Sequence, residues 1–258
     1  MLSDWLLGLP WPVVALAILV ACLLTVIGFS YLSFRFDAKD RTNDNMGRAA
    51  LAFLSSAFIF VGAFTIITSW NEDAAMRATA QTEVVAAQRL VHEVAILAPA
   101  DTTVHRAVLD YSEAVFERET GVDGQLAPSS VAAEKFVLVE RAATAVAQQP
   151  GVDAYRAGQV RDALDDLKTA RQDRQVELYN TIAVPLIALL LLMAALNLIG
   201  IGLFPSGTSR VLKFTFGILV AVSAAGLLTV VIVLESPPFV HHGLARPFES
   251  LITDLNGS

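Results

Sequence analysis

Four long stretches of apolar residues, two toward each end of the chain, dominate its hydrophobic pattern. They cover about residues 12–33, 49–68, 181–204 and 214–234, and none contains Asp, Glu, Lys or Arg. An α-helix rises 1.5 Å per residue, so about twenty apolar residues cross the ~30 Å hydrocarbon layer of a bilayer. Because a helix satisfies its own backbone polar groups, uncharged stretches of this length predict four transmembrane helices.

The first stretch contains Leu19-Val20-Ala21-Cys22, which has the look of a lipoprotein cleavage box. The residues before it carry Asp4 and no basic residue, whereas a cleaved signal begins with basic residues and has a short apolar core. The apolar run also continues well beyond Cys22. We therefore expect an uncleaved transmembrane helix with Cys22 as a buried thiol.

The polar region between the second and third spans, residues 70–180, holds eleven of the 18 basic and eighteen of the 25 acidic residues. Proline and glycine divide it into four helical stretches, over about 71–97, 101–120, 130–149 and from 153 to the third span. Asp101 suits the N-cap of the second stretch, and Ser130 with Glu134 lies near the spacing of a capping box for the third.

Apolar residues recur every three or four positions in all four stretches, which is the spacing of packed helices. No Pro or Gly separates Trp70 from the second span or Asn180 from the start of the third, so we expect the outer two stretches to continue those spans. The stripes are Ala80, Val84, Ala87, Val91, Val94 and Ala98; Val104, Val108, Tyr111 and Val115; Phe136, Val139, Ala143 and Val146; and Val160, Leu164, Leu167 and Leu178.

These patterns predict an all-α membrane protein with four spans in a two-plus-two arrangement and an inserted antiparallel four-helix bundle. The expected division is 1–69 for the first two spans and their short link, 70–180 for the bundle, 181–234 for the last two spans, and 235–258 for a tail.

The tail follows the fourth span directly. Pro237 and Pro238 favour an extended exit from the membrane helix, and Gly243 favours a turn. Beyond it, apolar residues at helical spacing predict a short amphipathic helix, either lying in the membrane interface or forming a lid over it. The apolar residues of this helix are Phe248, Leu251, Ile252 and Leu255.

Orientation follows from the two short links, because basic loops stay on the cytoplasmic side. The link between the first two spans carries Arg35, Lys39, Arg41 and Arg48, and the link between the last two carries Arg210 and Lys213. The two links lie on the same side by alternation. We therefore expect both termini and residues 70–180 to be extracytoplasmic.

Net charge and motifs narrow the function further. A formal net charge of −7 argues against a nucleic-acid partner, and the single cysteine excludes a multi-cysteine metal site. No nucleophile elbow, phosphate-binding loop, zinc-protease pair or dinucleotide fingerprint is present. The sequence therefore favours a protein that is not an enzyme and predicts neither a cofactor nor a metal.

Titratable residues of the polar region and the tail fit structural roles better than a metal site. His241 and His242 are adjacent and point apart on most backbones, and His92 and His105 fall in separate helical stretches. The carboxylates interpreted as a solvated helix face are Glu83, Glu93, Asp110, Glu113 and Glu117.

Asn197 is the one strongly polar residue deep in a span, and we expect it to bond across helices rather than to coordinate an ion.

The tail carries Pro238-Phe239, Gly243 and Pro247 after the last span, a pattern similar to the ending of the bacterial bestrophin-like family of four-span membrane proteins. Thr82-Glu83 in the first helical stretch adds to the resemblance. So does Tyr111, followed by Glu117 and Glu119, in the second. The sequence departs from the family pattern where Phe116 to Thr120 lacks an expected Trp, and where Pro237 precedes Pro238. The resemblance covers nearly the whole chain and implies a bacterial cytoplasmic-membrane location.

True bestrophins are homo-oligomeric chloride channels with a narrow neck lined by apolar and Phe side chains. The resemblance therefore draws attention to Phe53, Phe60 and Phe64, which lie within about 40° of one another on one face of the second span. They are candidates for a pore constriction that gates by dewetting. The alternative is that these rings pack against neighbouring helices or lipid.

Two functions stay open on the sequence. The first is a homo-oligomeric bestrophin-like anion channel in the lipid bilayer. The second is an accessory, scaffolding or sensory subunit of a larger membrane complex that uses the extracytoplasmic bundle. The sequence gives neither the oligomer number nor the transported species.

Overall fold

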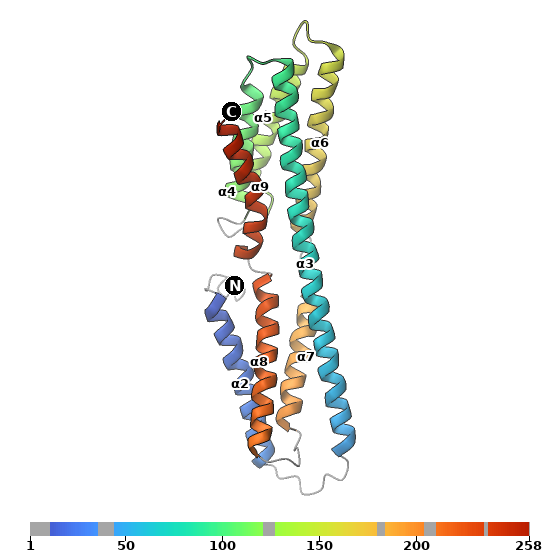
Figure 1. Cartoon of the computed structure of the whole chain (residues 1–258), viewed down its shortest axis with the longest axis vertical. Helices are drawn as coiled ribbons and strands as arrows, with labels where there is room; N and C mark the ends of the chain where they lie inside the picture. The colour runs from blue at the N-terminus through green and yellow to red at the C-terminus, as the bar shows by residue number, and fades with distance from the viewer. Residues whose placement is uncertain are drawn as a thin grey trace. The chain divides into compact units, whose positions relative to one another are not determined.

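The structure of the chain is a computed structural model that describes residues 11–35, 44–120, 127–179, 184–203, 210–234 and 237–257. Helices make up nearly all of these residues, and none of them forms a strand. The elements in chain order are α2 (Trp11–Arg35), α3 (Asp44–Leu97), α4 (Thr103–Glu119), α5 (Ser130–Ala147), α6 (Ala154–Tyr179), α7 (Val184–Leu203), α8 (Arg210–Leu234) and α9 (Pro237–Gly257) (Figure 1).

The chain divides into two compact units. The first contains residues 1–70 and 182–235, and the second contains residues 71–181 and 236–258. Three helices of the described chain are long and apolar enough to cross a membrane, in α2 (Pro12–Leu32), α3 (Ala49–Leu97) and α8 (Phe214–Val233). Helix α7 has a shorter apolar stretch, Leu186–Ile201.

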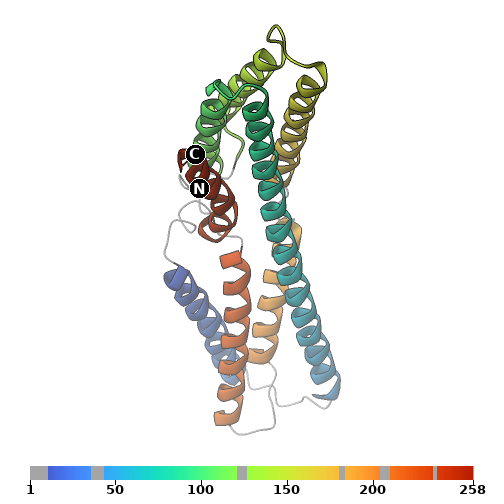
Figure 2. The same ribbon diagram turned by 45° about the horizontal axis from the view of Figure 1, so that its top comes forward.

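Helix α3 is one uninterrupted helix of 54 residues. It contains the second predicted span and the first helical stretch of the polar region, so the predicted continuation beyond Trp70 is confirmed (Figures 1 and 2). The matching prediction for α6 and the third span falls on residues 180–183, which lie outside the described residues.

In the first unit, α2 packs against α7 and α8. Small residues let these helices approach closely, as is usual in membranes. A Cβ atom built on Gly62 of α3 lies 2.4 Å from Leu227 Cδ1 of α8, and one built on Gly217 of α8 lies 2.7 Å from Val26 Cγ1 of α2. A side chain at either glycine would therefore require the facing Leu227 or Val26 side chain to move.

The second unit is the predicted helical bundle, built from α3 beyond Trp70 and from α4, α5 and α6. Its core includes the predicted stripes, because apolar residues at a spacing of three and four share one helix face. Only Val91 and Ala98 of the predicted set are partly buried rather than buried. Tyr111 and Phe136 meet at its centre edge-to-face, with ring centroids 5.2 Å apart.

Side chains accept backbone N–H groups at the starts of two of the bundle helices. The N-cap residue of α4 is Thr102, which makes no side-chain cap bond, so the cap predicted at Asp101 is wrong by one residue. The Asp101 carboxylate, one position earlier, accepts the backbone N–H of Thr103 at 2.9 Å. For α5 the N-cap is Ser129, whose hydroxyl oxygen accepts the N–H of Val131 at 3.2 Å. The cap predicted at Ser130 is therefore wrong by one residue.

The tail differs from its prediction. Helix α9 runs from Pro237 to Gly257 without a turn at Gly243, and Pro247 lies inside it. Prolines are compatible with the first turn of a helix, where the missing N–H has no intrahelical partner. The apolar face of α9, with Leu244, Phe248 and Leu251, is buried in the bundle core rather than lying on a membrane surface as a lid. Figures 1 and 2 show α9 beside α4.

Candidate functional site

The three phenylalanines of the second span form an exposed face of α3. Phe53 is 76% exposed, Phe60 72% and Phe64 54%. These rings therefore contribute nothing to the core of the first unit as the described residues build it, although α3 buries Phe58 on another face. Because the single chain leaves these rings exposed, only lipid or another protein chain can shield them from water.

Asn197 of α7 is buried and ties α7 to α3. Its amide oxygen accepts the hydroxyl of Ser55 at 2.6 Å, and its amide nitrogen donates to the carbonyl of Leu54 at 3.1 Å. A third bond runs to the carbonyl of Met193, one turn back on α7. Because these bonds occupy both ends of the amide, Asn197 is suited to holding two helices together.

Four polar side chains meet in the core of the bundle, and we refer to Glu83, Tyr111, Glu119 and Arg174 as the Arg174 cluster. Arg174 Nε donates to Glu83 Oε2 at 2.5 Å, and its Nη2 donates to Glu119 Oε2 at 2.6 Å. The hydroxyl of Tyr111 donates to the other oxygen of Glu83. None of the four is more than 1% exposed.

The cluster joins most of the bundle at one point. Its members come from α3, α4 and α6, and Glu119 also accepts the backbone N–H of Ser129 at 2.7 Å, immediately before α5. The guanidinium of Arg174 lies 5.4 Å from the ring centroid of Phe248, which brings α9 into contact with the cluster. One arginine therefore connects helices that are far apart in the sequence.

Electrostatics keep two members of the cluster, Tyr111 and Arg174, protonated. Burial, followed by the charge of Glu83, raises the pKa of Tyr111 well above its ordinary value, so the phenol stays protonated and donates. For Arg174, burial alone would lower the pKa, but Glu83, Tyr111 and Glu119 outweigh it and raise the pKa. The guanidinium therefore carries its charge throughout the physiological range.

The interpretation of Glu83 as part of a solvated face is wrong, because Glu83 is fully buried. The sequence held a signal for this. Glu83 follows Ala80 by three residues and precedes Ala87 by four, so it shares their buried face. Likewise Arg174 lies between Leu167 and Leu178 at the spacing of seven and four that continues the apolar stripe of α6. A charge within an apolar stripe indicates a buried partner of opposite sign.

Arg171, one turn before Arg174, lies over aromatic rings rather than in an ion pair. Its guanidinium carbon is 4.5 Å from the ring centroid of Phe136 and 5.9 Å from that of Tyr111. Its Nε is buried without a hydrogen-bond partner. Arg171 thus brings a second positive charge close to Tyr111, in addition to that of Arg174 in the cluster.

The predicted tail residues and histidines are not gathered into a site in the described part of the chain. Pro238, Phe239 and Gly243 lie in the first turns of α9, and their side chains, like those of His241 and His242, lie outside the described residues. His105 bonds the carbonyl of Leu255 at 2.9 Å, and His92 is exposed. No three His, Cys, Asp or Glu side chains among the described residues are placed to share a metal ion.

A family model decides the relationship that the tail and bundle residues suggest. The model of the Bestrophin-like domain matches residues 15–240, which is most of the chain. The chain belongs to the Bestrophin-like family. Three residues of the predicted resemblance, Glu83, Tyr111 and Glu119, are members of the Arg174 cluster. No protein among those with curated descriptions matches this chain.

Solved structures support the Bestrophin-like fold. A bacterial bestrophin homologue from Klebsiella pneumoniae carrying a single substitution is 14% identical, with a TM-score of 0.73, over 95% of this chain and 99% of that one. A second structure of that homologue, obtained by zinc phasing, is 15% identical, with a TM-score of 0.72, over 94% and 98%. At these identities the likeness shows the fold, and it extends over both units.

Proposed function

We propose that this Bestrophin-like protein is a homo-oligomeric membrane channel for anions and not an enzyme, with α3 of each copy facing a shared axis. The observation that carries the proposal is the exposed Phe face of α3. Phe53, Phe60 and Phe64 are large apolar side chains on one face of α3, and they face away from the protein's own core. Repeated around an axis, they would form stacked rings that gate by dewetting.

The exposed face of α3 continues with the same spacing beyond the phenylalanines. Steps of three and four residues lead along exposed positions from Phe64 as far as Val85. Charged residues of this segment, such as Glu72, Asp73 and Arg77, all fall on other faces. An uncharged seam at this spacing is the contact surface of self-associating helices. Its members are Ile67, Asn71, Ala74, Ala78, Gln81 and Val85.

Anion preference is compatible with this constriction even though the spans carry no basic residue. The edge of an aromatic ring is the positive side of its quadrupole, so ring edges turned toward an axis favour anions over cations. The apolar ring admits an ion only after partial dehydration, which chloride tolerates better than small cations of high charge density. Selectivity would then depend on ring geometry rather than on fixed charge.

Chloride flux from proteoliposomes tests the proposal. Purified full-length protein in liposomes loaded with chloride should release it on addition of a potassium ionophore, whereas protein-free liposomes should not. The particle in detergent should contain several copies of this chain alone. Absence of flux from a well-folded oligomer contradicts the channel, and a particle with a second protein in fixed ratio favours an accessory subunit of a larger membrane complex.

Membrane orientation is a separate part of the proposal. The basic residues of the two short links, among them Arg48, Arg210 and Lys213, favour a cytoplasmic location for the links. The bundle and both termini are then extracytoplasmic. Alkaline phosphatase fused after Gly121 should be active, and the same enzyme fused after Asn43 should be inactive. The reverse pattern would place the bundle in the cytoplasm and leave the channel proposal to be judged on flux alone.

A further inference from the structure

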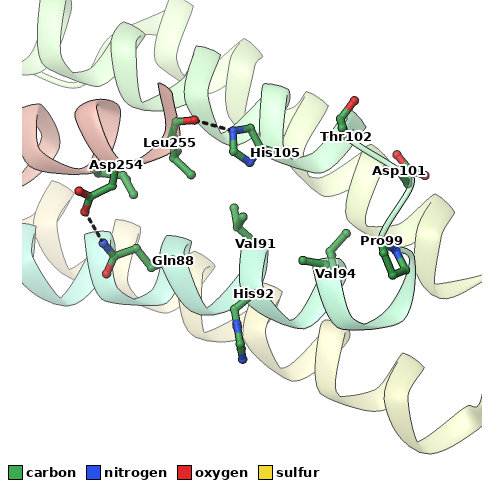
Figure 3. Close-up of a pocket in the computed structure, with 12 residues that line it drawn as sticks. Gln88, Val91, His92, Val94, Pro99, Asp101, Thr102, His105, Asp254 and Leu255 are labelled. Carbon is green, nitrogen blue, oxygen red and sulfur yellow. Dashed lines mark hydrogen bonds between the residues drawn. The ribbon is translucent and has the colours of Figure 1, made fainter. Parts of the chain in front are cut away.

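A cavity of about 570 Å³ lies in the bundle where α3 ends, α4 begins and the last turns of α9 pack against both (Figure 3). Apolar side chains, among them the buried Val94, Leu251 and Leu255, form part of its walls, and polar residues form the rest. This volume is in the range of small-molecule sites in proteins. The Arg174 cluster and the Phe face contribute no residue to it.

Two carboxylates and two histidines, His92 and His105, are the titratable groups that line the cavity. Asp101 and Asp254 line it, and neither Lys nor Arg does. The Asp101 carboxylate is committed to Thr103 and Gln149, and its hydrogen bonds to Thr103 lower its pKa, so it stays charged. Asp254 is less engaged, since Gln88 donates to it over 3.4 Å, a long distance for a hydrogen bond.

Two helix C-termini add to this negative potential. Both α3, ending at Leu97, and α9, ending at Gly257, finish beside the cavity, and neither has a basic residue in its last turn. A helix C-terminus carries about half a negative charge on its unpaired carbonyls. His105 bonds one such carbonyl, that of Leu255, and at the N-terminus of α4 the Asp101 carboxylate accepts the backbone N–H of Thr103. Neither Lys nor Arg lines the cavity to offset this negative potential.

The lining discriminates between ligand classes. An anion would meet two carboxylates and two negative helix ends, so the site excludes it. A divalent metal needs several converging ligands, but no three such side chains among the described residues converge, and His92 points away from the cavity in Figure 3. An ammonium group attached to an apolar body satisfies both the carboxylates and the Val94 and Leu251 walls.

We propose that this cavity binds a small organic cation, with its ammonium group at Asp254 and the α9 C-terminus and its apolar part against α3 and Leu251. The ligand would bridge α9 to the rest of the bundle. This inference stands on the geometry of the second unit and does not depend on the channel proposal.

Isothermal titration of the full-length protein in a non-ionic detergent tests the site with three probes of matched shape. These are 3-methylbutylammonium, its neutral counterpart 3-methylbutan-1-ol and the anion 3-methylbutanoate. Only the ammonium should bind, and its affinity should fall as ionic strength rises. Equal binding of the alcohol would show non-specific uptake by the detergent or by the apolar walls, and binding of the anion would refute the assignment.

Variants locate the binding. Asp254→Asn should weaken binding of the ammonium about fivefold, as expected for loss of a partly solvated charge-assisted contact. Asp162→Asn, an exposed carboxylate of α6 away from the cavity, removes the same charge and should leave binding unchanged. Ala95 of α3 lines the cavity. Ala95→Trp should therefore fill the cavity and abolish binding while the helical circular dichroism stays the same. Equal effects of the two Asp variants, or full binding by Ala95→Trp, would overturn the proposal.

Discussion

Replacing Arg174 with methionine should destabilise the bundle by about 3–5 kcal/mol. The substitution preserves much of the side-chain volume but leaves Glu83 and Glu119 buried without a counter-charge. It also removes the partner that Phe248 of α9 contacts. Protection of backbone amides in α4 and α6 against hydrogen exchange, measured on the full-length protein, gives the loss of stability directly.

Two further variants separate charge from packing in this result. Arg161→Met removes an exposed arginine from the same helix and should cost less than about 0.5 kcal/mol. Adding Glu83→Gln and Glu119→Gln to Arg174→Met should recover much of the lost stability, because no unpaired charge is then buried. An Arg174→Met protein as stable as the Arg161→Met control would show that the ion pairs contribute little.

Replacing Phe60 with alanine should raise chloride flux about tenfold, the factor that corresponds to lowering the barrier by roughly 1.4 kcal/mol. The alanine widens the proposed ring and lets water enter, which removes part of the dewetting barrier. Flux from proteoliposomes with equal amounts of oligomer measures the effect. Because Phe60 is 72% exposed in the single chain, the folded structure of each copy should not change.

A matched phenylalanine on another helix is the control. Phe216 of α8 is 61% exposed and lies in the fourth span, so Phe216→Ala removes an exposed ring that is not on α3. Its flux should equal that of the unmodified protein. If both variants behave alike, the Phe face of α3 lines no constriction and its rings contact lipid.

Periodicity alone was enough to predict most of the helices. The stripe from Val104 to Val115, for example, is buried as its spacing indicates, because a helix packed on one side must place its apolar residues on that side. The predicted uncharged apolar stretches are likewise helical in the structure, three of them as long helices and the third stretch as a shorter one. In both cases the information is local: it lies within one helix and needs no knowledge of its neighbours.

The Arg174 cluster could not be assembled by the same reasoning. Which carboxylate meets Arg174 depends on how α3, α4 and α6 pack, and Glu83 lies 91 positions away in the sequence. Composition also misled, since acidic residues in a polar region are usually solvated. The prediction for the tail was wrong for a related reason. Pro237 and Gly243 favour an extended exit and a turn, but tertiary contacts of the apolar face of α9 outweigh these local preferences.

The long sequence separation within the cluster constrains how the protein is made. At about 5–20 residues per second, Arg174 leaves the ribosome several seconds after Glu83 and Glu119. Until then, closing α3 onto α4 would bury two like charges. We therefore expect α3 and α4 of the nascent chain to stay apart until α6 is synthesised. The bundle then packs around Arg174, and α9 packs against it last.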